Sequence, residues 1–474
     1  MSTAYKMIEE AEKLGPGCLW FEETVGAYPS FLGSMPFAPT HMTRSKRMLS
    51  STVSDLCPIF GYGPGHKDAE LLFEAPSGSL LGFSLFEDSP SANAILIGST
   101  GSGKSTLACG IALGMAAGSK PNAPSIFVID VGNSFKRSIE YLEGSSLDLS
   151  PEKGLVINPF DLAIGQGKPD PEKVKFLTAL FEEILGEAGR LDKLEKSLLE
   201  TALLEFYETN TIRTLSTFQA YLNQSKLPEL KRMATLLALW CRPHPFGLLF
   251  DGETNVNLKA SHLHFELKGC QRYPDLLRVA MLVVMDSIWG EVRLRNPKRS
   301  LIIIDECHTL IRPSGDGRTN SSARWVEDCF RQMRKFSSAA IAISQTASDL
   351  RSDEIGDGII ANAPNRFILR QRGDERALKD SLKLNDHELK EVFSLKQIRG
   401  QYSEFYLQSE SMKGVFLYRP TALELWLSTT HPPDVELLEK ERIKRPDRSL
   451  FDLMKFMAAH YPNGAEGGAL ATKD

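Results

Sequence analysis

The sequence predicts an α/β fold with a mostly parallel sheet and an all-α insertion. A strand, glycine loop and helix pattern spans residues 94–108, and further short apolar runs alternate with helical periods along the chain. The stretch 169–240 has only helical periodicity. Alternating strands and helices around a glycine loop favour a parallel sheet with helices on both faces.

The first 130 residues are predicted to contain a helix, an extended connector and then strands. Residues 3–14 have a helical pattern, and residues 26–66 are rich in Gly, Pro, Ser and Thr, which indicates an extended connector. Strands are expected from 69 to 97. Another buried parallel strand is predicted at 125–129, because this β-rich run follows Pro124 and ends at Asp130.

The insertion begins with Asp170 as a helix cap and Pro171 in the first turn. Apolar residues then recur at helical spacing in two stripes, at 174, 177, 181 and 184 and at 191, 194, 198 and 202. Such stripes are typical of helices that pack against a core. A further helix is expected over 228–240.

The α/β pattern returns after the insertion and continues to the C-terminal helices. Strands are expected at 263–267, 299–304, 339–344, 366–370, 404–407 and 415–418, with helices at 275–291, at 322–336 and after 433. The predicted domains are therefore 1–66 (helix and connector), 67–168 with 241–425 (α/β), 169–240 (all-α), and 426–474 (helices and a flexible tail).

The glycine loop has the composition of a nucleotide phosphate cradle. It reads Gly98, Ser99, Thr100, Gly101, Ser102, Gly103, Lys104, Ser105, Thr106. Glycines let the backbone N–H groups point inward at phosphates, while the lysine reaches the β- and γ-oxygens and Ser105 can hold Mg²⁺. The helix that follows directs its N-terminal dipole at the same anion. The loop predicts binding of a nucleoside triphosphate, with ATP and Mg²⁺ as the expected ligands.

Two later strand ends supply the counterpart of this loop. The apolar run 301–304 ends in Asp305 and Glu306, at the edge of the sheet where open α/β folds bind ligands. Asp305 is expected to support Mg²⁺, and Glu306 to orient and polarise the attacking water. The strand 339–344 ends at Gln345, from which an amide could sense the γ-phosphate or the water. Alone, an acid pair or a polar strand end is equally typical of a capped or solvated position.

The expected helix at 322–336 carries a second set of candidates. Its apolar face holds Trp325, Cys329, Met333 and Phe336, and the opposite side holds Arg324, Arg331 and Arg334. These arginines are either a solvated basic face or an arginine finger that reaches the γ-phosphate of a neighbouring subunit. Arg334 is the first choice for that contact and Arg331 the second. Arg366, Arg370 and Arg372 are a weaker set.

Composition narrows the class of protein further. A 42% apolar and 24% charged chain of 474 residues is globular, and its net charge of −5 without a basic tract does not favour dedicated nucleic-acid binding. Its seven scattered cysteines suggest reduced thiols in the cytosol. Cys241, His244, His262 and His264 fit no common zinc spacing. No apolar run approaches the ~20 residues needed to span a membrane.

The motifs, taken in order, resemble the TraC-type ATPases of conjugative type IV secretion systems. The resemblance covers roughly residues 27–450. Besides the motifs above, it rests on 128–134 (Val-Ile-Asp-Val-Gly-Asn-Ser), 157–162 (Ile-Asn-Pro-Phe-Asp-Leu), 246–252 (Phe-Gly-Leu-Leu-Phe-Asp-Gly), 265–267 (Phe-Glu-Leu) and 402–404 (Tyr-Ser-Glu).

This resemblance implies a RecA-like core with a small helical insertion. It also implies ATP hydrolysis by a hexamer, inner-membrane secretion-channel subunits as partners, and a cytoplasmic location peripheral to the bacterial inner membrane. Two departures stand out. The family's large N-terminal domain is nearly absent, and Cys307-His308 follows the acid pair where many relatives have Ala-Trp or Phe-Trp.

Two other functions remain open at this point. A hexameric DNA-translocating motor, like the HerA, FtsK or coupling-protein ATPases, would share the core and the Gln345 sensor. Membrane-anchored coupling proteins would add N-terminal spanning helices. A slow, ATP-dependent assembly module is the third reading. DNA binding is expected to be weak because of the negative net charge.

Overall fold

The computed structural model describes residues 63–67, 69–117, 123–162, 167–185, 191–295, 298–311, 321–346, 354–373 and 375–467, with four isolated positions before residue 51. The chain divides into two compact units, residues 1–61 and 62–474, and the fold below is that of the second. The helix predicted at 3–14, nearly all of the connector at 26–66 and the last seven residues of the tail lie outside the described residues.

The described strands form one twelve-stranded sheet. They are β1 (Leu71–Glu74), β2 (Leu80–Phe83), β3 (Ala94–Ile97), β4 (Ser125–Asp130), β5 (Ser145–Asp148), β6 (His262–Glu266), β7 (Ser300–Ile304), β8 (Ser338–Ser344), β9 (Asn365–Leu369), β10 (Gln397–Ile398), β11 (Tyr402–Gln408) and β12 (Lys413–Tyr418). The order is β2-β1-β12-β11-β9-β3-β8-β7-β4-β6-β5, with β10 beside β11. The run from β9 to β5 is parallel, and the remaining strands pair antiparallel. The predicted mostly parallel α/β fold is confirmed.

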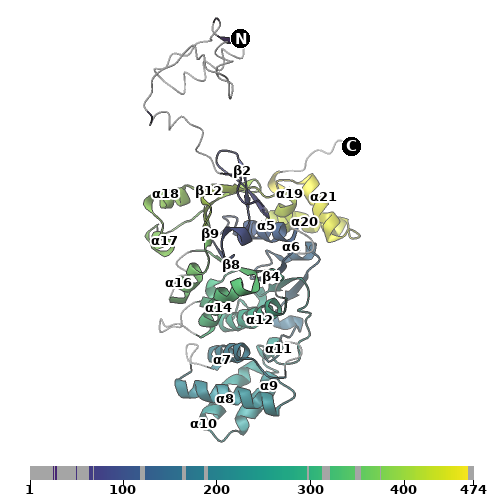
Figure 1. The fold of residues 1–474 in the computed structure, drawn as a ribbon. Helices are drawn as coiled ribbons and strands as arrows, with labels where there is room; N and C mark the ends of the chain where they lie inside the picture. The colour runs from purple at the N-terminus through teal and green to yellow at the C-terminus, as the bar shows by residue number, and fades with distance from the viewer. Residues whose placement is uncertain are drawn as a thin grey trace. The chain divides into compact units, whose positions relative to one another are not determined.

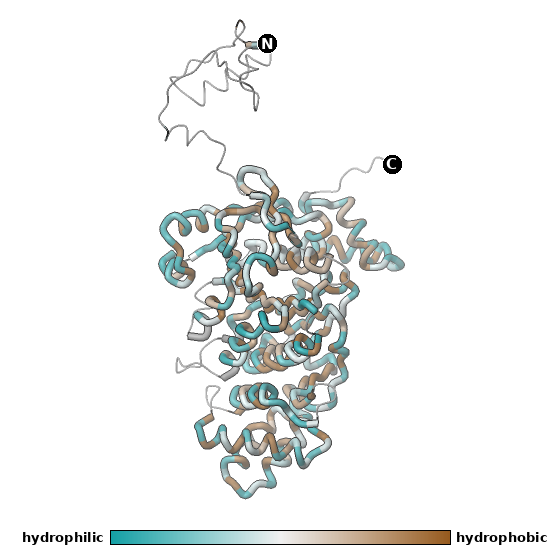
Figure 2. The backbone as a smooth tube through the Cα atoms, viewed as in Figure 1, coloured by the Kyte–Doolittle hydropathy of each residue, from teal (hydrophilic) through white to brown (hydrophobic). Residues whose placement is uncertain are grey.

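The central strands β3, β4, β7 and β8 are buried along their whole length. Their continuous apolar sequences reflect cover on both faces, as is usual for parallel strands. Ile95 and Ile97 face a core shared with α12 (Pro274–Arg295) and α14 (Ser321–Gln332), whereas Leu96 faces a second core shared with α5 (Lys104–Ala117) and α6 (Lys136–Tyr141). Figure 2 shows the hydrophobic segments concentrated in these inner layers.

Four helices occupy the region predicted to be an insertion. They are α7 (Pro171–Leu185), α8 (Lys193–Thr209), α9 (Leu215–Gln224) and α10 (Pro228–Leu237), followed by the 3₁₀ turn η2 (Ala238–Trp240). Asp170 caps α7 as expected, because its Oδ1 accepts the Lys173 N–H at 2.8 Å. Figure 1 places these helices together at one end of the second unit.

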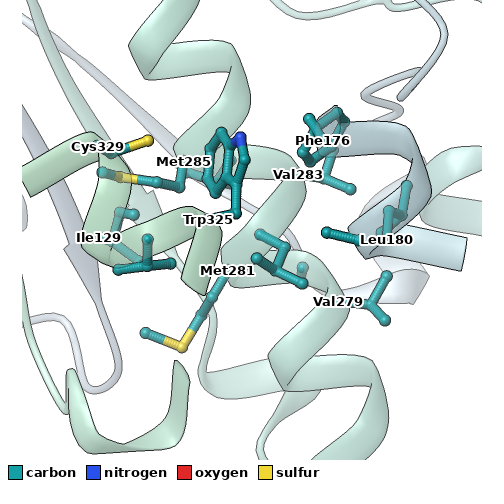
Figure 3. Close-up of a cluster of buried hydrophobic side chains, with 14 of the residues drawn as sticks. Ile129, Phe176, Leu180, Val279, Met281, Val283, Met285, Trp325 and Cys329 are labelled. Atoms are coloured by element: carbon teal, nitrogen blue, oxygen red, sulfur yellow. The ribbon is translucent and has the colours of Figure 1, made fainter. Parts of the chain in front are cut away.

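The helices share one apolar core with the sheet. Phe218 of α9 packs against Phe181 and Phe206 at ring distances of 5.0 Å. Phe176 of α7 meets Trp325 of α14 at 5.3 Å, and Figure 3 shows this contact among side chains of α12. No strand occurs among the described residues of 169–240. The boundaries of a separate all-α domain remain a prediction.

The remaining described helices divide into longer and short ones. The longer ones are α16 (Glu354–Ala361), α17 (Glu375–Leu382), α18 (Asp386–Ser394), α19 (Ala422–Ser428), α20 (Pro432–Lys444) and α21 (Leu450–His460). The short ones are α4 (Leu85–Asp88), α11 (Gly247–Phe250), α13 (His308–Ile311), η1 (Pro151–Lys153), η3 (Lys268–Cys270), η4 (Met333–Phe336) and η5 (Ala465–Gly467). Trp426, Met454 and Met457 anchor a third core between α19 and α21.

Two features of the sheet differ from the sequence-based expectation. The strands expected at 404–407 and 415–418 form an antiparallel hairpin that joins β1 and β2 to the parallel part. The short strand β5 at the opposite edge was not predicted, because its residues are only half-buried and polar. In the described part of the chain, no helix combines the length and the apolar character that crossing a bilayer requires.

Candidate nucleotide site

The glycine loop follows β3 directly and leads into α5. Gly101 and Gly103 have φ of 76° and 95°, a left-handed conformation that favours glycine. Gly98 has no room for a side chain, because an added Cβ would lie 2.4 Å from Ser102 Oγ and 2.9 Å from Leu369 Cβ. The glycines of the loop are therefore required by backbone shape and close packing.

Two neighbouring strands hold this loop in place. The Gly98 N–H donates to Ser344 O at 3.3 Å, and the Ser99 N–H and hydroxyl both donate to Arg370 O, at 3.1 and 3.0 Å. Ser344 ends β8 and Arg370 follows β9, the strands on either side of β3. The loop is thus suspended across the carboxyl edge of three parallel strands.

Lys104 lies at the first position of α5 and turns back over the loop. Its Nζ donates to Gly98 O at 2.5 Å and to Ser99 O at 3.3 Å. Burial lowers the pKa of this amine, while the neighbouring Asp305 and Glu306 oppose the shift. Ser105 and Thr106 follow in the first turn and are partly buried. The lysine therefore lies between the loop and the acid pair.

The acid pair follows β7, as predicted. Burial is the main cause that raises the pKa of Asp305 to about 7, and the carboxylates of Asp130 and Glu306 add to the shift. Asp305 Oδ1 accepts the Glu306 N–H at 3.0 Å. Glu306 has φ of 48°, which is uncommon for a residue with a side chain and turns the chain sharply after the strand.

The Glu306 carboxylate is contacted on both oxygens. Gln345 Nε2 donates to Oε1 at 2.9 Å, and His308 Nδ1 lies 3.1 Å from Oε2. The His308 contact is the largest cause that lowers the pKa of Glu306. On its other side, Gln345 Oε1 accepts the Thr100 hydroxyl at 3.4 Å. The structure thus connects the glycine loop, the end of β8 and the acid pair.

Arg331 and Arg334, the two arginines preferred for the contact with a neighbouring subunit, lie at the amino end of β8, opposite the carboxyl edge that holds the loop. Arg331 lies in the last turn of α14 and pairs with Glu327 at 2.5 Å, and Arg334 is exposed in η4. Both precede β8, whose seven residues separate them from Gln345 by roughly 20 Å at ~3.3 Å per residue. They cannot reach the loop of their own chain. A role toward a neighbouring subunit stays a prediction.

The structure adds three buried residues beside the acid pair that sequence reasoning did not assign to a site. Asp130, His264 and Glu266 form a cluster whose oxygen and nitrogen atoms lie within 4.8 Å of one another. Asp130 ends an apolar strand just as Asp305 does, and this was the signal that could have identified it. Within the described part of the chain, His264 groups with these carboxylates. That Cys241, His244, His262 and His264 form no zinc site stays a prediction.

A separate cavity lies away from this chemistry. It measures about 910 Å³ and is bounded by residues of α7, α8 and α14, among them Lys175, Glu182 and Arg324. None of its lining residues belongs to the glycine loop or the acid pair. The cavity is therefore separate from the glycine loop and the acid pair.

The site combines a buried strand, a glycine loop that wraps onto its lysine, and a carboxylate pair after β7, which β8 separates from β3. These features together define a P-loop nucleoside triphosphatase. A protein-family model and several solved structures are similar to this chain, and the family model identifies its family. The TraG P-loop domain model matches residues 89–448, and the chain belongs to that family.

One solved structure shows the same fold, and two others are less similar. VirB4 of Thermoanaerobacter pseudethanolicus superposes with a TM-score of 0.63 at 19% identity, covering 74% of this chain and 96% of that one. The bacterial conjugative coupling protein TrwBdeltaN70 gives 0.48 at 14% identity, covering 70% and 85%. TrwB in complex with ADP and Mg²⁺ gives 0.47 at 14%, covering 69% and 84%. No curated protein matches the sequence.

Proposed function

We propose that this chain hydrolyses ATP in a Mg²⁺-dependent reaction and that hydrolysis powers the assembly of, or substrate transfer by, a type IV secretion apparatus. The observation that carries the proposal is the connection from Thr100 through Gln345 to Glu306. It joins the phosphate loop to the carboxylate that would orient water. Membership of the TraG P-loop family and the motif resemblance to secretion ATPases support the cellular role.

The loop binds the phosphates in this proposal. Its backbone N–H groups and the N-terminus of α5 attract the anion. Lys104 exchanges its bonds to Gly98 O and Ser99 O for phosphate oxygens. Burial makes such a charge-assisted contact stronger than it would be in water.

Ser105 and Asp305 are the proposed metal ligands. A hydroxyl and a carboxylate are oxygen donors of the kind that Mg²⁺ prefers, and Mg²⁺ usually keeps several waters. The partial burial of both side chains beside Lys104 fits a cation bound next to phosphates. When bound, the cation neutralises charge on the β- and γ-phosphate oxygens.

Glu306 is the proposed group that orients and polarises the attacking water, and Gln345 positions it. The 2.9 Å bond from Gln345 fixes one carboxylate oxygen, and the lowered pKa keeps the group ionised at neutral pH. An ionised carboxylate held in this way can accept a hydrogen bond from water. This assignment gives each of the two strand ends a distinct role.

The active assembly is proposed to be a hexamer that docks on inner-membrane channel subunits. Arg334 is the first candidate for the contact with a neighbour's γ-phosphate, because it is exposed and makes no ion pair with another described residue. Arg331 is second, since Glu327 and Asp328 already engage its guanidinium.

The direct test is ATP turnover by the purified full chain with and without Mg²⁺. Lys104→Ala should lose nucleotide binding or turnover, and Glu306→Gln should bind ATP but hydrolyse it slowly. Lys153→Ala, at an exposed lysine of η1, is the matched control and should behave as wild type. Equal turnover by all four proteins would overturn the assignment.

The cellular role needs a second experiment. Channel subunits that co-purify from the native host and stimulate turnover would support secretion. Tight DNA binding near physiological salt, with strong stimulation by DNA and none by channel subunits, would replace it with a translocating motor. Turnover that stays slow with every partner would favour the assembly module.

A further inference from the structure

Acidic residues of three adjacent parallel strands are aligned in register at the carboxyl edge of the sheet. Ile129 of β4 pairs with Ile304 of β7, so Asp130 and Asp305 occupy the next position on each strand. Asp130 also pairs in register with Glu266 of β6. Side chains alternate between the two faces of the sheet along a strand. Asp130 and Asp305 therefore both project from the face that packs against α5, the helix that follows the phosphate loop.

The Asp130 side chain is completely buried and held by two donors on one oxygen. Its Oδ2 accepts the Phe135 N–H at 3.0 Å and lies 3.0 Å from His264 Nε2. The other nitrogen of His264 lies 2.8 Å from the Ser146 hydroxyl. These contacts leave the carboxylate a single orientation, with Oδ1 as the remaining acceptor.

That remaining oxygen has no partner among the described residues. Asp130 Oδ1 is buried and accepts no hydrogen bond. Leaving a buried carboxylate oxygen unpaired costs on the order of 1–3 kcal/mol or more, so such atoms usually have a ligand or water beside them. Asp130 is also close enough to Asp305 for its charge to raise the pKa of that side chain.

Glu266, by contrast, is already satisfied. Its carboxylate accepts the backbone N–H groups of Gly132, Asn133 and Lys268. Gly132 and Asn133 both have positive φ, so Glu266 shapes the turn after β4. Of the two carboxylates aligned with Asp305 on the neighbouring strands, Asp130 is therefore the one whose second oxygen lacks a hydrogen-bond donor among the described residues.

We propose that Asp130 is a second carboxylate of the metal site, which accepts a hydrogen bond from a water in the shell of the Mg²⁺ held by Ser105 and Asp305. His264 is its positioning residue, and Ser146 orients His264. This inference rests on the proposed function. Mg²⁺ keeps several of its waters when bound by one or two protein ligands, and partners of that outer shell are typically worth 10- to 100-fold in metal affinity.

The test uses the full chain loaded with ADP and titrated with Mn²⁺ as the probe, read by calorimetry and by the Mn²⁺ EPR signal. Asp130→Asn should weaken Mn²⁺ binding about 10-fold while leaving ADP affinity in EDTA unchanged. Asp148→Asn is the matched control. It lies at the same level on β5, and its carboxylate is satisfied locally by Ser150.

Unchanged Mn²⁺ affinity in folded Asp130→Asn would overturn the inference. If that variant does not fold, His264→Gln is measured instead. We expect it to bind Mn²⁺ several-fold more weakly than the wild type, and unchanged binding would contradict the proposal. Failure of the wild type to bind Mn²⁺ with ADP would overturn the proposed function itself. An effect of Asp148→Asn as large as that of Asp130→Asn would overturn the specific assignment.

Discussion

Gln345 donates a 2.9 Å hydrogen bond to Glu306, although 38 residues of sequence lie between them. The bond crosses from the end of β8 to the turn after β7, its neighbour in the sheet. Glu306 also has His308 on its second oxygen. The orientation of this carboxylate is therefore set by groups that differ in chemistry, a neutral amide and an imidazole.

Replacing Gln345 with Ala should slow turnover more than it weakens nucleotide binding. A misplaced reacting group costs up to about 100-fold in rate, so we expect kcat to fall 10- to 100-fold with a smaller change in KM. Steady-state kinetics measures both. Gln401→Ala, an exposed glutamine, is the control, and an unchanged kcat in Gln345→Ala would contradict the role.

His308→Ala should shift the acid limb of the activity profile to higher pH. The contact with His308 is the largest cause that lowers the pKa of Glu306, so without it the carboxylate becomes protonated at a higher pH as acid is added. The measurement is kcat/KM over a pH range that begins below 4.5, the ordinary pKa of a glutamate. His387→Ala, which removes an exposed histidine near Glu391, should leave the limb in place. A shift to lower pH would refute the argument.

Asp305→Asn should stabilise the nucleotide-free, metal-free protein at pH 8. The pKa of Asp305 in the folded protein is raised to about 7. The stability that the protonated carboxyl group contributes is therefore present in full below the unfolded pKa near 4, and it is lost as pH rises through 7. We expect a gain of roughly 1–3 kcal/mol in the free energy of unfolding at pH 8 and little at pH 4.

Urea unfolding at both pH values measures this difference. Asp447→Asn, at an exposed position, serves as the control and should show no pH-dependent gain. Equal stabilisation by Asp305→Asn at pH 4 and pH 8 would show that the carboxyl group does not carry the effect.

Mixing inactive subunits should reveal whether hydrolysis is shared. Arg334→Ala and Glu306→Gln subunits are each expected to be slow, and their mixture should recover part of the activity, because one intact arginine can meet one intact glutamate across an interface. An arginine finger supplies ~10³-fold or more in rate. Lys335→Ala, the exposed neighbour, is the control, and normal turnover by Arg334→Ala alone would remove it from the mechanism.

The sequence was sufficient where structure depends on neighbours in the chain. The phosphate loop is contiguous, and the positive φ of Gly101 and Gly103 is a local backbone property that favours glycine. The helix that follows begins directly at Lys104. The central strands were predictable because burial on both faces demands continuous apolar runs such as Ala94–Ile97. The cap at Asp170 is likewise a local hydrogen bond.

Contacts between distant segments were decided by the tertiary structure. Periodicity carries no information on register, so the level alignment of Asp130, Asp305 and Glu266 emerges only when the three strands pair. Sequence analysis also did not predict the contact between His308 and Glu306, which lies in a turn where Glu306 has a positive φ. Local chemistry thus determined which groups are available, and strand pairing determined which of them meet.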